Sequence, residues 1–204
     1  MERIEDPENP DKAPRKKRGP RKVSPDYLKK AALHYLEQRA TSTAMLRTSL
    51  MRKVARSVEV HGTDAEEATG WVEALLVRLT ELGLLNDDAF SEMRAASLNR
   101  QGKGSRYIRG ALARQGLGDN QVDQALESLK DDHPDPDLAA AQKLARRRGL
   151  GPYRADPDQR RDRFERDMAS LARAGFDYAT VRRVLDAETA EELEDLIEAD
   201  LNPE

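Results

Sequence analysis

Apolar residues recur every three or four positions along most of the chain, which is the spacing of one face of an α-helix. The first such stretch begins at Ser24-Pro25-Asp26. Serine can cap free backbone N–H groups there, proline suits the first helical turn, and aspartate suits the positive end of a helix. The spacing predicts a helix from 25 to about 39, a second through Leu46, Leu50, Met51 and Val54, and a third from about 69 to 82. The segment 58–67, which holds His61-Gly62, is expected to be a loop.

The eight residues from Gly83 to Phe90 predict a tight corner between two helices. Gly83 fits a left-handed C-terminal cap, and Asn86 fits the cap of the next helix, with two aspartates in its positive first turn. Leu85 and Phe90 have the spacing of a pair that closes over such a cap. Further helices are expected over 87–100, 106–115 and 119–129, with a break at Gly102-Lys103-Gly104-Ser105.

An internal repeat links this stretch to the next one. After a Pro/Asp linker at 131–137, where the prolines exclude regular helix, helices are expected at about 137–148, 158–174 and 178–187. In each copy of the repeat we expect a helix that ends on a left-handed glycine, with an apolar residue beneath the turn. Leu112-Ala113-Arg114-Gln115-Gly116-Leu117, with Val122 and Leu126, aligns without gaps on Leu171-Ala172-Arg173-Ala174-Gly175-Phe176, with Val181 and Leu185.

These patterns predict an all-α protein of three tandem three-helix repeats that form an elongated, curved array with disordered charged tails. The repeats are placed at 24–84, 85–130 and 131–187. Residues 188–204 are expected to be an acidic tail with room for some helix. Residues 1–23 are expected to be a disordered basic tail, because almost nothing there is apolar. Its basic residues from 12 onward are Lys12, Arg15, Lys16, Lys17, Arg18, Arg21 and Lys22.

The composition narrows the class of protein further. Charged residues make up 36% of the chain and aromatic residues 4%, which favours a surface-rich helical protein with an aliphatic core. Cysteine is absent, and this excludes disulfides, thiolate nucleophiles and cysteine-ligated metal sites. No apolar run approaches the roughly 20 residues that span a bilayer. We expect a cytoplasmic protein with no membrane association, and a monomer, because no apolar stripe suggests self-association.

No arrangement of residues predicts catalysis, and we expect no enzyme activity, no metal and no cofactor. The Gly102-Lys103-Gly104-Ser105 step lacks the upstream glycine and the preceding strand of a phosphate loop. His34, His61 and His133 are far apart in the sequence and are expected on a helix, in a loop and in a linker.

Three motifs, taken in order and spacing, resemble the RecX family of recombination regulators. They are Leu-Gly-Leu-Leu-Asn-Asp-Asp-Ala-Phe at 82–90, Gln-Gly-Lys-Gly at 101–104 and Leu-Ala-Arg-Gln-Gly-Leu at 112–117. The resemblance covers roughly residues 26 to 187 and is strongest over 82–129. The chain departs from the family pattern at Leu84, where an aromatic residue is usual, in the longer loop of the first unit, and in both charged tails.

The resemblance implies a regulator of RecA, the ATP-dependent recombinase that forms helical filaments on single-stranded DNA. Members of the family lie along the filament groove and restrain filament extension, ATP hydrolysis, strand exchange and coprotease activity, in DNA repair, recombination and the SOS response. An elongated repeat array suits this task because its quasi-linear surface can contact successive filament subunits. The sequence does not distinguish binding at the filament ends from binding along the length of the groove.

Two groups of basic residues are candidates for contact with an acidic filament surface or with DNA phosphate. Each residue, taken singly, also fits an ordinary solvated helix surface. The alternative function is a helix-turn-helix-like regulator that binds single- or double-stranded DNA directly, helped by the basic tail. A further alternative makes the repeats a scaffold whose tails recruit another partner. The candidates are Arg94, Arg100, Lys103, Arg106, Arg109 and Arg114 in the second repeat and Lys143, Arg146, Arg147, Arg148 and Arg154 in the third.

Overall fold

The computed structural model describes residues 19–201 of the chain. Within that range the chain forms ten α-helices, two short 3-10 turns and no strand, so the predicted all-α class is confirmed. The first unit holds α1 (Pro25–Gln38), α2 (Thr43–His61) and α3 (Ala65–Glu81), and the second holds α4 (Asp87–Arg100), α5 (Ser105–Ala113) and α6 (Asp119–Glu127). The third unit holds α7 (Pro136–Arg148), α8 (Pro157–Arg173), α9 (Tyr178–Asp186) and α10 (Ala190–Leu201), and the 3-10 turns are Ser128–Asp131 and Gly151–Tyr153.

Two helix starts confirm the capping expected from the sequence. Ser24 Oγ accepts a hydrogen bond of 3.2 Å from the backbone N–H of Tyr27 at the start of α1. Asn86 Oδ1 accepts one of 2.9 Å from the backbone N–H of Ala89 at the start of α4. Gly83 has the left-handed φ of +70° that the predicted corner between α3 and α4 requires.

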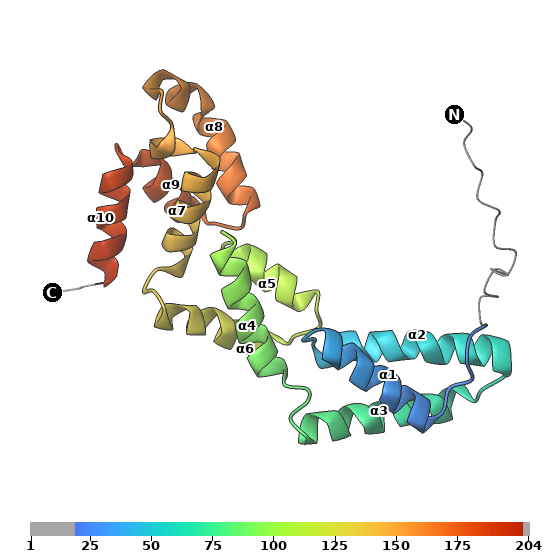
Figure 1. Cartoon of the computed structure of the whole chain (residues 1–204). Helices are drawn as coiled ribbons and strands as arrows, with labels where there is room; N and C mark the ends of the chain where they lie inside the picture. The colour runs from blue at the N-terminus through green and yellow to red at the C-terminus, as the bar shows by residue number, and fades with distance from the viewer. Residues whose placement is uncertain (1–18, 202–204) are drawn as a thin grey trace, which may run out of the picture.

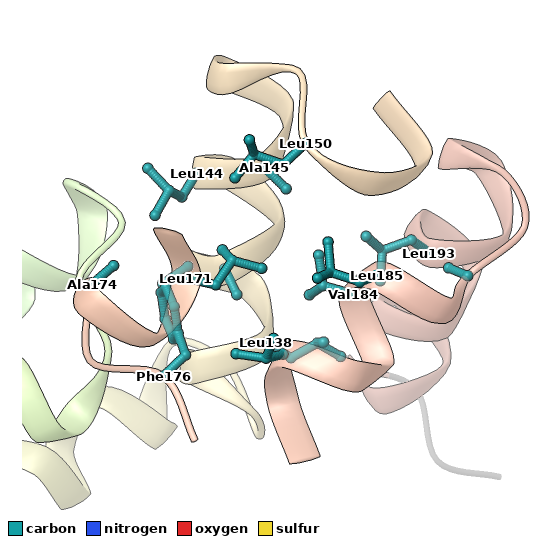
Figure 2. Close-up of a cluster of buried hydrophobic side chains, with 14 residues drawn as sticks. Leu138, Leu144, Ala145, Leu150, Leu171, Ala174, Phe176, Val184, Leu185 and Leu193 are labelled. Atoms are coloured by element: carbon teal, nitrogen blue, oxygen red, sulfur yellow. The ribbon is translucent and has the colours of Figure 1, made fainter. Parts of the chain in front are cut away.

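Each unit buries an apolar core of its own, and the units follow one another in an elongated, bent arrangement (Figure 1). The cores have no buried residue in common, so the relative placement of the units depends on contacts at their junctions. Leu85 belongs to the first core and Phe90 to the second, so the corner joins two cores. The third core, shown in Figure 2, includes Leu138, Leu144, Leu171, Phe176, Val184, Leu185 and Leu193.

The loop predicted over 58–67 is wrong, because α2 continues to His61. Val58 packs against the first core and keeps the helix in contact with it. The helix then ends on Gly62, whose φ is +61°, and Asp64 Oδ1 caps α3 by accepting a 2.7 Å hydrogen bond from the Glu67 N–H. The connection between α2 and α3 in the first unit is therefore a short turn and not the long loop that was predicted.

The basic segment at the N-terminus is not all tail. Residues 1–18 lie outside the described residues, but residues 19–23 contact the first unit at two points. Val23 is buried, and its N–H donates to Ser57 Oγ at 3.0 Å, while His61 Nε2 lies 2.7 Å from the carbonyl oxygen of Pro20. The predicted boundary at residue 23 is wrong because Val23 is an apolar side chain that completes the first core.

The acidic segment at the C-terminus contains a packed helix. α10 lies against α7, and Leu193 is fully buried in the third core. The guanidinium of Arg160 donates to the carbonyl oxygens of Leu185, Ala187 and Glu188 and holds the turn before α10 in place. The predicted boundary at 187 is therefore wrong, and the third unit has four α-helices. Val23 and Leu193 thus add apolar side chains to the cores of the two terminal units.

The first and second units meet where the N-terminus of α2 lies against the turn between α5 and α6. Gly116, which forms this turn at a φ of +78°, has no room for a side chain, because a Cβ there would lie 2.3 Å from the Cβ of Ala44. Ser42 Oγ donates to the carbonyl oxygen of Gln115 at 2.5 Å. A close backbone approach therefore fixes this junction.

The second and third units meet in the same way, with the N-terminus of α5 against the turn between α8 and α9. Gly175, at a φ of +99°, would place a Cβ 2.4 Å from the backbone nitrogen of Tyr107. The N–H groups of Gly104 and Arg106 donate to the carbonyl oxygens of Ala174 and Gly175 at 2.9 and 3.3 Å. Gly116 and Gly175 are the matching glycines of the internal repeat, so the repeat encodes the junction as well as the turn.

Replacement of Gly175 by alanine tests this steric constraint. The variant combines left-handed strain with a clash against Tyr107, and we expect it to lose about 3 kcal/mol of unfolding free energy or more. Gly62→Ala is the matched control, since Gly62 has a φ of +61° and open space around it, and it should lose only about 1 kcal/mol. Urea denaturation followed by circular dichroism measures both. Equal losses would show that the junction has room for a side chain.

Candidate macromolecular interface

The N-terminus of α5 is capped by a carboxylate from the next unit. Gly104, at the cap position, has no side chain to offer. Asp137, in the first turn of α7, accepts hydrogen bonds from the N–H of Ser105 at 3.0 Å and from its hydroxyl at 2.8 Å. The first junction is built alike, because Asp87 in the first turn of α4 accepts a 2.8 Å hydrogen bond from the N–H of Thr43 at the start of α2. Each junction thus pairs a glycine contact with a carboxylate cap.

The carboxylates at the second junction differ in acidity. Burial raises the pKa of Asp137 above its ordinary value of 3.8, while the hydrogen bonds from Ser105 oppose the rise. The pKa of nearby Asp177 is lowered, chiefly by hydrogen bonds from Thr180 and also by the positive charge of Arg106. At this junction Asp137 therefore ionises less readily than an ordinary aspartate, and Asp177 ionises more readily.

The Gly102–Ser105 step offers no free amides to a phosphate group. The N–H of Gly104 donates to Ala174, that of Ser105 to Asp137, and that of Arg106 to Gly175. A helix N-terminus binds an anion through unpaired N–H groups, and here the third unit occupies them. The same contacts that join the two units therefore close this position to a ligand.

Five of the predicted contact residues have partners within the protein. Arg109 pairs with Asp123 at 2.6 Å, and the guanidinium of Arg148 donates to Ser170 at 3.0 Å. Arg146 lies 3.8 Å from Glu194 of α10, a long and exposed pair. Arg109, Arg146 and Arg148 are exposed, so an internal partner does not remove them from an interface. The five are Arg109, Arg146, Arg147, Arg148 and Arg154.

Among the predicted contact residues, Arg154 is the one least available to another molecule. Two of its nitrogens donate to the carboxylate of Asp167 at 3.0 and 2.7 Å, and the Asp167 side chain is only 4% exposed. The N–H of Gly151 donates to the same carboxylate at 3.1 Å. A buried acid of this kind needs its cation, so Arg154 stabilises the third unit and has little free surface.

Four basic residues come from the end of α4, the turn after it and helix α7, which contacts α4, and we name Arg100, Lys103, Lys143 and Arg147 the junction basic cluster. The turn that contains Gly102 packs on α7, where a Cβ on Gly102 would lie 3.0 Å from the Cβ of Leu144. Lys143 and Arg147 are one helical turn apart on α7. The guanidinium of Arg147 donates to the carbonyl oxygen of Gln101 at 3.1 Å, and Lys103 lies 4.4 Å from the ring centre of Tyr107.

The remaining candidates are dispersed. Arg94 on α4 is half-buried, and Arg106 faces the third unit and Asp177. Arg114 lies at the other junction, where it lines a hollow together with Arg39 and Arg52 of the first unit. Arg39 and Arg52 were not among the predicted contact residues, because only the docking of α2 on Gly116 brings them near Arg114.

The described residues offer neither a metal site nor a membrane-spanning helix as a further candidate. Between residues 19 and 201, no three His, Asp or Glu side chains are grouped so that they could hold a metal ion. None of the helices in that same range has the length and apolar character needed to cross a bilayer.

Known proteins resemble the chain in sequence and in fold. A family model described as "RecX, second three-helix domain" matches residues 86–126. The chain is 41% identical to the regulatory protein RecX of Myxococcus xanthus over 184 residues, which cover 89% of this chain and 96% of the relative. It is 31% identical to the regulatory protein RecX of Agrobacterium fabrum, over 84% of this chain and 88% of that one. The crystal structure of RecX from Lactobacillus salivarius has the same fold, with a TM-score of 0.60 at 21% identity over 80% of this chain and 96% of that chain.

The raised pKa of Asp137 predicts a pH dependence of stability. The folded chain holds a proton on Asp137 at pH values where the unfolded chain has released it, so this contribution to stability is complete below 3.8 and is lost as pH rises through the raised pKa. Asp137→Asn keeps the size and one accepting oxygen but cannot ionise.

The unfolding free energy of the native chain, relative to that of Asp137→Asn, should therefore fall as pH increases across this window. Urea titrations of both proteins at a series of pH values measure the difference, and all other groups cancel to a first approximation. A difference that grows with pH would mean that the junction favours the ionised form.

Proposed function

The chain belongs to the RecX family, and we propose that it restrains the RecA recombinase by lying in the groove of the RecA–DNA filament. The observation that carries this proposal is the 41% identity to a regulatory protein RecX over 96% of that protein's length. At that coverage, both junctions and most of the three units belong to the matched region. The proposal adds the identity of the partner and the mode of binding.

The shape of the array supports groove binding. A RecA filament presents equivalent subunits along a helical path, and a protein with several rigid units in a row can contact more than one of them. The glycine contacts and carboxylate caps fix the angle at each junction, so little flexibility has to be lost on binding. The bent line of units in Figure 1 therefore suits a curved groove better than a flat surface.

The junction basic cluster is the contact that we propose for an acidic part of the filament. Its four cations come from two units, so a partner that pairs with them also holds the second junction in its observed geometry. Electrostatic complementarity of this kind chiefly increases the rate and specificity of association.

Restraint of the filament requires a difference in affinity between its states. A ligand that bound the active and the inactive filament equally would change neither population. In this proposal the rigid array binds the groove of the restrained filament more tightly than that of the extended one. Binding therefore increases the population of the restrained filament, and ATP hydrolysis, strand exchange and coprotease action become slower.

The direct test is ATP hydrolysis by RecA on single-stranded DNA. Addition of the chain at substoichiometric to equimolar amounts should lower the hydrolysis rate. An unchanged rate at equimolar protein would contradict the proposal. If the chain instead binds naked DNA with a steep salt dependence and RecA adds nothing to that binding, the direct DNA-binding alternative is favoured.

The junction basic cluster can be tested by a triple variant, Arg100→Gln, Lys103→Gln and Lys143→Gln. Arg147 is left in place because it joins the two units. Loss of these three charge contacts should raise the concentration for half-maximal inhibition about tenfold. The matched control changes Arg161, Arg163 and Arg166 to glutamine, since these are exposed arginines of α8 and the net charge changes equally. Equal effects from both variants would rule out a specific role for the cluster.

A further inference from the structure

A hollow of about 580 Å³ lies where the first and second units meet. Helices α1 and α2 form one side, and the turn after α5 forms the other. The side chains that give it its chemistry are three arginines, two hydroxyls and one phenol: Arg39, Arg52, Arg114, Thr48, Ser49 and Tyr35. All three arginines are exposed, so their guanidinium groups are available to a partner.

A second hollow, of about 350 Å³, continues along α1 and α2 toward the N-terminus. Tyr35 and Ser49 line both hollows, so the two adjoin. The second hollow adds the cations Arg21, Lys30 and Lys53. We name the two together the first-unit groove.

The charge of the first-unit groove is of one sign. Six basic side chains line it, and among the residues that the structure describes no Asp or Glu does so. The whole chain has a formal net charge of -3, so this concentration of positive charge is local. Lys30 has an ion-pair partner, Asp26 at 2.7 Å, but that pair is exposed and weak. A partner for the groove must therefore be anionic along its length.

Two aromatic rings alternate with these cations. The guanidinium of Arg39 lies 4.8 Å from the ring centre of Tyr35, and the ammonium of Lys53 lies 6.0 Å from that of Tyr27. Both rings are only partly buried. Arginine planes and aromatic rings are surfaces on which unpaired bases stack, and a cationic groove with such surfaces is typical of single-strand binding.

We propose that the first-unit groove binds single-stranded DNA, with the arginines on successive phosphates and unpaired bases against the tyrosine and arginine faces. A duplex has its bases stacked on each other and would leave these faces unused. An acidic protein surface would pair with the cations but would leave the two partly exposed rings unused. α1 is about 21 Å long, enough for a site of about four nucleotides, at the lower end of single-strand site sizes.

This proposal goes beyond the restraint of RecA, because the groove lies on the first unit and would bind DNA without RecA. The two proposals can therefore fail separately. RecA inhibition is measured on the filament, whereas the groove is tested with DNA and the full chain alone.

The test is fluorescence anisotropy of a labelled oligothymidylate with the full chain, at several salt concentrations. The triple variant Arg39→Gln, Arg52→Gln and Arg114→Gln removes three phosphate contacts. It should raise Kd on the order of 100-fold near 0.1 M salt and lower the slope of log K against log salt by about 2 units. The α8 triple variant of Arg161, Arg163 and Arg166 has the same net charge and should change Kd less than about threefold.

Two further measurements separate stacking from charge. Tyr35→Leu should weaken binding about tenfold without a change in salt slope, since a ring contributes to affinity and releases no counterions. Tyr35→Phe keeps the ring and should bind like the native chain. Polyglutamate of matched charge should compete poorly with the oligothymidylate.

The proposal is overturned if the groove and α8 triple variants lose affinity equally, if polyglutamate competes as well as DNA, or if a duplex of the same length binds as tightly as the single strand. Thermal unfolding of each variant identifies a folding defect, which exposed arginines should not cause. If the triple variant unfolds, Arg52→Gln alone, with an expected rise in Kd of about fivefold, carries the test.

Discussion

At both junctions the N-terminus of a helix lies so close to a turn of the next unit that only glycine fits in that turn. A Cβ on Gly116 or Gly175 would fall within 2.5 Å of an atom across the junction. Because the three cores are separate, these contacts, with the caps from Asp87 and Asp137, decide how the units are placed. The bend of the array and every surface that spans two units depend on them.

The sequence predicted most of the helices because their apolar spacing and caps are local properties of the chain. It also located Gly116 and Gly175, but only as helix ends, since a close approach between units leaves no local signal. The same holds for Asp87, which was expected to favour its own helix and also caps α2. The boundaries of the first and third units were placed too far inward, because single apolar residues such as Val23 and Leu193 are outnumbered by charged neighbours.

The candidate interface was less predictable than the fold. Abundant arginine made a basic surface easy to predict, yet the structure divides those residues by their partners. Arg154 balances the buried Asp167, whereas Arg147 donates across the junction to the carbonyl oxygen of Gln101. Arg39 and Arg52 were not selected, because they join Arg114 only through the docking of α2. Which cations meet across a junction depends on how the units dock, and no local pattern in the sequence indicates it.

The central claim is that a rigid, bent array acts as one body on a helical nucleoprotein filament. A reconstruction of the chain bound to RecA on single-stranded DNA tests it most directly. We predict density for all three units in the groove, at the junction angles of the free protein, with more than one RecA subunit in contact. Density for one unit only, or units that have separated at Gly116 or Gly175, would contradict it.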